Sequence, residues 1–239
     1  MRRAVIAIAG ILLALGCSAA QARGVAPKSR EPVVVELFTS QGCSSCVAAD
    51  KLIDQISAKP GVLVLTLAVD YWDYLGWNDT FAKPEFSARQ RAYMKRLALR
   101  DLYTPQVIVD GVGQAPGADD KKVDELILKA QRQKPTGPRI RLLRHGKVQV
   151  EAGAAPKGGA DVWLVRFDPT TQEVAVKRGE NRGQTLAQKN VVRELVRLGA
   201  WTGKARAYPL PPSADAKTLK SAILVQAVHG GRILRVLVK

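Results

Sequence analysis

The alternation of apolar and polar positions divides the chain into two regions of different character. Between residues 33 and 133, short apolar runs alternate with stretches whose apolar residues recur at helical spacing. This pattern predicts strands over residues 33–38, 62–69 and 106–109, with a hairpin back through Val112, and helices over residues 47–58 and 84–99. A last helix begins at Asp119 or Asp120, with apolar positions at Val123, Leu126, Ile127 and Ala130.

In the second region, residues 136–239, the pattern predicts strands only. Its short apolar runs are separated by turn residues, and they cover residues 139–143, 148–151, 162–167, 174–177, 191–198, 205–208, 222–228 and 233–238. Evenly spaced strands of this kind are typical of a β-sandwich. The pattern changes at residues 134–138, where two prolines and a glycine end the last helical stretch. We therefore expect an α/β domain over residues 23–135, followed by an all-β sandwich-like domain over residues 136–239.

Residues 1–22 have the pattern of a signal peptide. Arg2 and Arg3 precede a short apolar stretch, and residues 20–22 offer an A-x-A cleavage site. We expect the mature chain to be exported to the periplasm or secreted. A lipoprotein anchored through Cys17 is the less favoured alternative, because Ala14 stands where such signals usually carry leucine. No other apolar run is long enough to span a bilayer, so we expect no transmembrane segment.

Charge is distributed unevenly between the two regions. Residues 23–135 contain 16 Lys or Arg and 14 Asp or Glu, whereas residues 136–239 contain 19 and 7. The second region thus carries a net charge of +12 and the first only +2. A solvated basic surface is the favoured interpretation, and weak contact of residues 136–239 with anionic surfaces is the functional one. We expect no nucleic-acid partner, because no recognisable module accompanies the charge.

Cys43 and Cys46 form a C-x-x-C motif between the first predicted strand and the first predicted helix. This placement is typical of a thioredoxin-like redox centre, and the order of elements in residues 33–133 is that of a thioredoxin fold. Cys43 is expected at the helix N-terminus, where unpaired backbone N–H groups favour a thiolate. Signal-peptide cleavage removes Cys17 and leaves this single pair. A disulfide closing so small a loop adds little stability, so redox chemistry is favoured over a structural disulfide.

Further residues are expected near the cysteines because parallel strands end at one edge of a sheet. Thr104 and Pro105 precede the third strand, and we predict a cis bond between them that leaves backbone groups free for an extended substrate. Tyr71 and Trp72 belong to an aromatic stretch that forms either a substrate surface or a local core. Two candidates for a proton acceptor near Cys46 follow from the strands, namely Glu36 and Asp70. For Glu36, a paired structural carboxylate is the favoured alternative.

Several strings resemble the exported, thioredoxin-like family known as domain of unknown function 1223. They are the stretches at residues 36–46, 69–77, 87–93 and 103–106, and in the second region those at residues 178–183 and 190–193. The sequence departs from the resemblance at Val47, where we expect a proline after the second cysteine. The family name implies no reaction.

Two classes of function follow from these observations. The first is a cell-envelope thiol–disulfide exchange protein in which Cys43 attacks a partner's sulfur and Cys46 resolves the mixed disulfide. Its partners would be protein thiols or disulfides, and we expect no cofactor and no bound metal. The second is a non-catalytic binding or assembly protein whose cysteines are structural or hold a metal. An exposed Cys43 favours the first class and a buried pair the second. Whether the second region acts separately or walls the cysteine cleft is left open.

Overall fold

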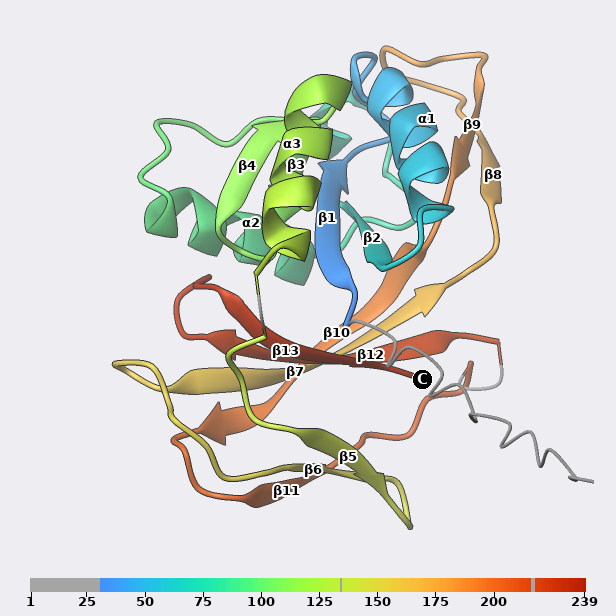
Figure 1. Ribbon diagram of the computed structural model, residues 1–239. Helices are drawn as coiled ribbons and strands as arrows, with labels where there is room; N and C mark the ends of the chain where they lie inside the picture. Colours follow the sequence, from blue (N-terminus) through green and yellow to red (C-terminus); the bar gives the residue numbers. More distant parts are fainter. Residues whose placement is uncertain (1–30, 134, 216–217) are drawn as a thin grey trace, which may run out of the picture.

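One large mixed sheet organises the molecule. The structure is a computed structural model, and it describes residues 31–133, 135–215 and 218–239. The sheet has eight strands in the order β13-β12-β7-β10-β2-β1-β3-β4 (Figure 1). Two smaller antiparallel sheets accompany it, one with the order β11-β6-β5 and one made of β8 and β9. The predicted signal peptide and Cys17 lie outside the described residues.

The helices and strands of the first predicted region begin and end close to the expected residues. The helices are α1 (Cys46–Ser57), α2 (Pro84–Arg96) and α3 (Asp120–Gln131), with a short 3-10 helix η1 (Asp73–Leu75) before α2. The strands of this region are β1 (Val33–Thr39), β2 (Val62–Ala68), β3 (Gln106–Val109) and β4 (Gly113–Pro116). β1 and β2 run parallel, while β3 and β4 are antiparallel to their neighbours.

The remaining strands belong to the second predicted region. They are β5 (Ile140–Leu143), β6 (Lys147–Val150), β7 (Ala160–Asp168), β8 (Gln172–Ala175), β9 (Thr185–Gln188), β10 (Val191–Trp201), β11 (Arg206–Pro209), β12 (Lys220–Ala227) and β13 (Ile233–Val238). β9 was not predicted. It is short and alternates exposed and buried residues, and it pairs only with β8 to form a hairpin.

Strand β1 is buried along its whole length and separates two apolar cores. Because side chains alternate along a strand, Val33, Val35 and Leu37 face α1 and α3, whereas Val34 and Phe38 face α2. Figure 1 shows α1 and α3 in front of β1 and α2 behind it. The two faces of β1 are therefore covered by different helices, and this alternation decides what each polar side chain of the strand can contact.

The large sheet runs through both predicted regions. β10 lies beside β2, with Val191 paired to Thr66. The Thr66 backbone N–H donates to the Asn190 carbonyl at 3.0 Å, and the Thr66 hydroxyl donates to the Lys189 carbonyl at 2.6 Å. The core that contains Phe38 and Phe86 also contains Val165 from β7 and Val192 from β10. The sequence analysis did not anticipate this pairing.

The three-stranded sheet packs against the part of the large sheet that the second region supplies. Val148 and Val150 of β6 and Tyr208 of β11 share an apolar core with Leu164 of β7 and Val225 of β12. The Trp201 ring, at the end of β10, is fully buried in the same core. Two sheets thus pack face to face around side chains from both, below the helices in Figure 1.

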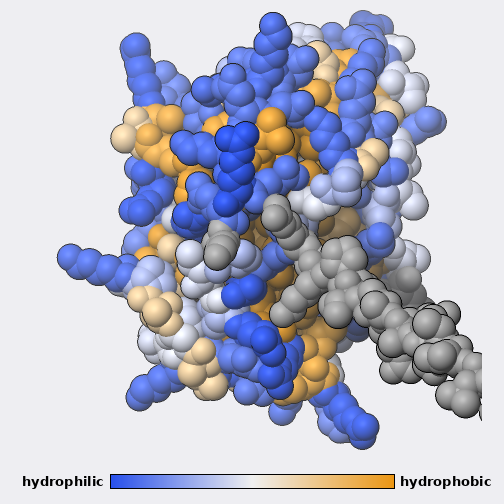
Figure 2. Space-filling view, viewed as in Figure 1, coloured by the Kyte–Doolittle hydropathy of each residue, from blue (hydrophilic) through white to orange (hydrophobic). Residues whose placement is uncertain are grey.

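The face of the molecule drawn in Figure 2 is largely polar. On the face seen in Figure 2, hydrophilic side chains project on all sides and hydrophobic residues show between them. Within the described residues, no helix is both long and apolar enough to cross a membrane.

Candidate functional site

The cysteine loop connects the end of β1 to the start of α1. Cys43 and Cys46 form a disulfide, with their Cα atoms 5.4 Å apart. The prediction that Cys43 opens the helix is wrong, since α1 begins at Cys46. The reason is a turn in which the Cys46 backbone N–H donates to the Cys43 carbonyl at 3.2 Å, so that Cys43 lies three residues ahead of the helix.

Both cysteines are buried. Cys43 is 0% and Cys46 is 1% exposed, although Ser44 and Ser45 between them are exposed. The Ser45 hydroxyl lies 3.4 Å from the Cys43 sulfur. A molecule that approaches the cysteine loop therefore contacts Ser44 and Ser45 first, because the Cys43 sulfur lies beneath the surface.

A loop from the second region lies against the cysteines. This segment, residues 176–184, joins β8 to β9 and is called the hairpin loop below. The Asn181 amide donates to the Cys43 and Gln41 carbonyls at 3.0 Å each. The Glu180 carboxylate accepts bonds from the Ser44 backbone N–H at 2.9 Å and from the Ser44 hydroxyl at 2.7 Å, and these bonds lower the pKa of Glu180. The second region thus forms one wall of the cysteine site, an alternative that the sequence left open.

Gln41 ties the cysteine loop to two other segments. Its backbone N–H donates to the Asp79 carboxylate at 2.6 Å, and its side-chain oxygen accepts from the Trp77 indole at 3.0 Å. Its side-chain amide donates to the Gln188 side-chain oxygen of β9 at 3.3 Å. Gln41 itself is fully buried. The turn before Cys43 is therefore held by polar contacts from several elements.

Trp72 lies beside the cysteine loop and is hydrogen-bonded to Thr104, which precedes Pro105. The Trp72 indole donates to the Thr104 hydroxyl at 2.8 Å, and a Cβ placed on Gly42 would lie 3.4 Å from the Trp72 Cβ. The Thr104–Pro105 bond is cis, as predicted. Pro105 packs on Gly117, where an added Cβ would approach Pro105 at 2.8 Å and Ala49 of α1 at 3.0 Å.

The other predicted site residues have different partners. Tyr71 donates its hydroxyl to the Gln90 side chain at 3.1 Å, and Asp70 accepts a bond from the Ser87 hydroxyl at 2.5 Å. Glu36 points to the α2 face of the sheet, because it alternates with the β1 residues that face α1. There it accepts from Arg89 Nε at 2.5 Å and from the Tyr93 hydroxyl. Glu36 and the cysteine helix α1 are therefore on opposite faces of β1.

Sequence reasoning missed a carboxylate on the cysteine helix. Asp50 follows Cys46 by one helical turn and is 5% exposed. One of its oxygens, Oδ1, accepts from the Thr39 hydroxyl at 3.2 Å, and Oδ2 has no partner in the part of the chain that the structure describes. Burial raises the pKa of Asp50 to about 8. The signal was present in the sequence, because Asp50 falls within the buried stripe formed by Cys46, Ala49 and Ile53.

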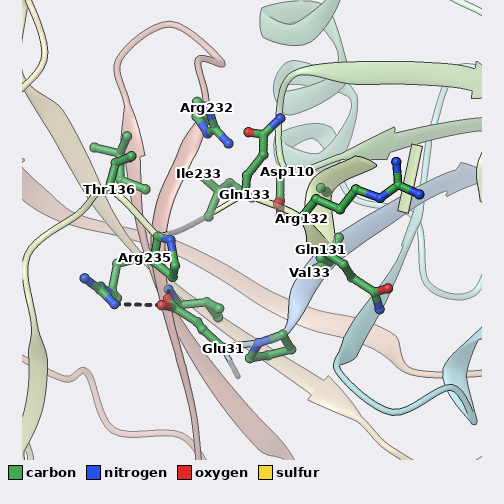
Figure 3. Close-up of a pocket in the computed structure, with 15 residues that line it drawn as sticks. Glu31, Val33, Asp110, Gln131, Arg132, Gln133, Thr136, Arg232, Ile233 and Arg235 are labelled. Carbon is green, nitrogen blue, oxygen red and sulfur yellow. Dashed lines mark hydrogen bonds and ion pairs between the residues drawn. The ribbon is translucent and has the colours of Figure 1, made fainter. Parts of the chain in front are cut away.

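One cavity lies away from the cysteines, at the other end of β1. It has a volume of about 530 Å³ and is bounded by Glu31, Val33, Arg232 and Arg235, among others (Figure 3). Val33 begins β1 and Cys43 follows its end, so the cavity is about 20 Å away, the length of a seven-residue strand. Nor do the described residues hold any group of three His, Cys, Asp or Glu side chains arranged to bind a metal ion.

Comparison with known proteins identifies the family. Residues 34–226 match the family described as "Protein of unknown function (DUF1223)". The chain belongs to this family. The DUF1223 match includes the cysteine loop, Asp50 and the hairpin loop, so all parts of the site described above lie within it.

A solved structure resembles this DUF1223 protein over most of its length. It is the crystal structure of protein AGR_C_4864 from Agrobacterium tumefaciens, which is 32% identical, with a TM-score of 0.70. The similarity covers 87% of this chain and 94% of that one. No curated protein matches the chain.

Proposed function

We propose that this protein exchanges thiols and disulfides with protein partners in the cell envelope through Cys43 and Cys46. The observation that carries the proposal is the disulfide itself, which spans only three residues at the start of α1. A disulfide that closes so small a loop removes little entropy from the unfolded chain. The protein has two large apolar cores around β1 and does not need such a link for its stability.

The surroundings of the disulfide support the same proposal. Trp72 lies beside the cysteine loop and is bonded to Thr104, whose bond to Pro105 is cis, and these contacts support a role in substrate binding. In the proposed reaction Cys43 forms the mixed disulfide and Cys46 resolves it. The hairpin loop lies against the segment that a partner must approach, because Asn181 is bonded to the Cys43 carbonyl.

The burial of both sulfurs favours a second candidate function. Cys43 is covered completely, and Glu180 and Asn181 bind the cysteine loop. A disulfide that stays covered would act as a fixed support for the loop, in a binding or assembly protein without redox turnover. Reactive cysteines are usually partly exposed, so this alternative has a physical basis.

Trapping of mixed disulfides separates the two functions. Cys46→Ala removes the resolving sulfur, so this variant should accumulate mixed disulfides on Cys43 in cells. Cys43→Ala should accumulate none, and it is the matched control because it also removes the intramolecular disulfide. The adducts are measured by non-reducing electrophoresis after rapid alkylation. Equal trapping by both variants, or by neither, would contradict the proposed exchange and favour the structural alternative.

A further inference from the structure

Asp50 is placed to act on the sulfur of Cys46. The two residues are four apart in α1, a spacing that puts side chains on the same helix face with Cβ atoms about 5–6 Å apart. Helical side chains lean toward the N-terminus, so the Asp50 carboxyl covers the turn that carries Cys46. Both residues are buried on the inner side of the helix, away from bulk water.

The polar groups around Asp50 come from β1, from β9 and from the loop that carries Asp79. The Thr39 hydroxyl at the end of β1 donates to Oδ1, and the nearby side chain of Gln188 in β9 also lowers the pKa of Asp50. Asp79 is the charged group that acts on Asp50, and as a like charge it raises the pKa. Within the described residues no cation is bonded to Asp50, and its Oδ2 and the Gln188 Nε2 are the two buried side-chain atoms without a hydrogen-bond partner. Asp50 thus has an oxygen free to hold a proton.

We propose that Asp50 exchanges a proton with the Cys46 sulfur each time the disulfide opens or closes. This inference rests on the proposed function. During opening, a partner thiolate attacks the Cys43 sulfur and the Cys43–Cys46 bond breaks. The Cys46 sulfur leaves with the electron pair and takes the proton from the Asp50 carboxyl. During closing, the Asp50 carboxylate takes the Cys46 thiol proton, Cys46 attacks Cys43, and the partner leaves as a thiolate.

The protonation of Asp50 suits both directions. Burial raises the pKa of the carboxyl to about 8, so it is mostly protonated in the oxidised protein at neutral pH. A proton-transfer group is most effective when its pKa lies near the working pH, because it then gives and takes the proton with similar ease. A solvent-exposed aspartate with its ordinary pKa would be ionised and unable to donate to the leaving sulfur.

The test follows reduction of the Cys43–Cys46 disulfide by dithiothreitol in the full-length protein. The rate is read from tryptophan fluorescence and divided by the dithiothreitol thiolate concentration at each pH. For the wild type this rate constant should fall by up to about tenfold between pH 7 and pH 9, as Asp50 ionises. Asp50→Asn should be at least tenfold slower than the wild type at pH 7 and show no such fall. Asp54→Asn, an exposed aspartate on the same helix, is the matched control and should behave as the wild type.

A second measurement compares the infrared spectra of the wild type and Asp50→Asn. The infrared band of a protonated carboxyl should be present in the oxidised wild type at pH 7, absent from Asp50→Asn, and lost with a midpoint near pH 8. An Asp50→Asn variant with the wild-type rate and pH profile would overturn the proton-exchange role alone. If Asp50→Asn fails to fold, a midpoint below pH 6 for the loss of this band in the wild type would also overturn the proton-exchange role. A wild-type disulfide that dithiothreitol does not reduce at any pH would overturn the proposed function, and this inference with it.

Discussion

Two buried carboxylates lie on opposite faces of β1 and its neighbours, and they have opposite surroundings. Glu36 is 1% exposed and is bound by the Arg89 guanidinium through both of its oxygens, with the Tyr93 hydroxyl as a further partner. Asp50 is 5% exposed and accepts one hydrogen bond, from Thr39. The first carboxylate has a cation in contact and the second has none among the described residues.

The difference shows that the partner, not the depth of burial, decides what a buried carboxylate does. Burial alone would lower the pKa of Arg89, but Glu36 and Tyr93 together, through charge and hydrogen bonds, outweigh this and raise it, so Arg89 is held in its charged form. Arg89 also lies 5.2 Å from the centre of the Tyr93 ring, and Gln226 of β12 donates to the Tyr93 hydroxyl. Glu36 therefore joins β1, α2 and β12, whereas Asp50 stays available for proton transfer.

Breaking the ion pair between Arg89 and Glu36 should have the largest effect on the stability of the protein. Arg89→Met keeps an unbranched apolar stem and leaves Glu36 buried without a cation, which costs about 3–5 kcal/mol of unfolding free energy. Urea unfolding measures the loss. The double variant Glu36→Gln and Arg89→Met should recover part of it, because no unpaired charge is left. A loss below about 1 kcal/mol in the single variant would show that the pair is not a structural tie.

The pH dependence of stability should reveal the raised pKa of Asp50 in the folded protein. Its carboxyl has a higher pKa in the folded protein, about 8, than its ordinary value of 3.8, so the folded state binds more protons between these values. The stability is then greatest on the acid side of this interval and falls as pH rises, by up to about 1.4 kcal/mol per pH unit.

The comparison of variants isolates this effect. Burial also raises the pKa values of Asp79 and Asp110, which contribute in the same direction. The decisive quantity is therefore the difference between the wild type and Asp50→Asn in urea unfolding at pH 6 and pH 8, roughly 2 kcal/mol. Asp54→Asn should keep the wild-type dependence. Parallel curves for the wild type and Asp50→Asn would show that Asp50 does not titrate in this range.

Removing the hydrogen bond from Thr39 should have the smallest effect. This bond lowers the pKa of Asp50, so Thr39→Val should raise it further. A hydrogen bond to a charged carboxylate is worth about 1 kcal/mol more than one to the neutral acid, which corresponds to somewhat less than one pKa unit. Titration of the Asp50 carboxyl carbon by nuclear magnetic resonance measures the shift. A pKa that moves downward would mean that Thr39 does not bind the carboxylate.

The fold of the first region was predictable because its sequence patterns are local. The apolar run of β2 and the helical spacing of Val123 and Ile127 in α3 each reflect burial of one short segment. The pairing of β10 with β2 was not predictable in this way, since it depends on one contact between Val191 and Thr66. No turn or spacing in the sequence records a contact between residues so far apart.

The site was predictable in part for the same reason. The spacing of Cys43 and Cys46 predicted that they can form a disulfide. The position of Thr104 and Pro105 before a strand predicted the cis bond between them. Glu36 seemed a candidate because it is a carboxylate on a buried strand, but the sequence does not reveal that Arg89 neutralises it. The contacts of Glu180 and Asn181 with the cysteine loop could be recognised only from the path of the β8–β9 hairpin in space. Both residues nevertheless lie in one of the sequence stretches that resemble the family.

The bond from Asn181 to Cys43 joins residues 138 positions apart, and this separation sets an order in time. On the ribosome, chain growth at about 5–20 residues per second makes the cysteines on the order of ten seconds before the residues that cover them. During this interval the Cys43 carbonyl lacks its hydrogen bond from Asn181. A disulfide that forms in this interval forms on an open chain, whereas one that forms later does so inside the folded site.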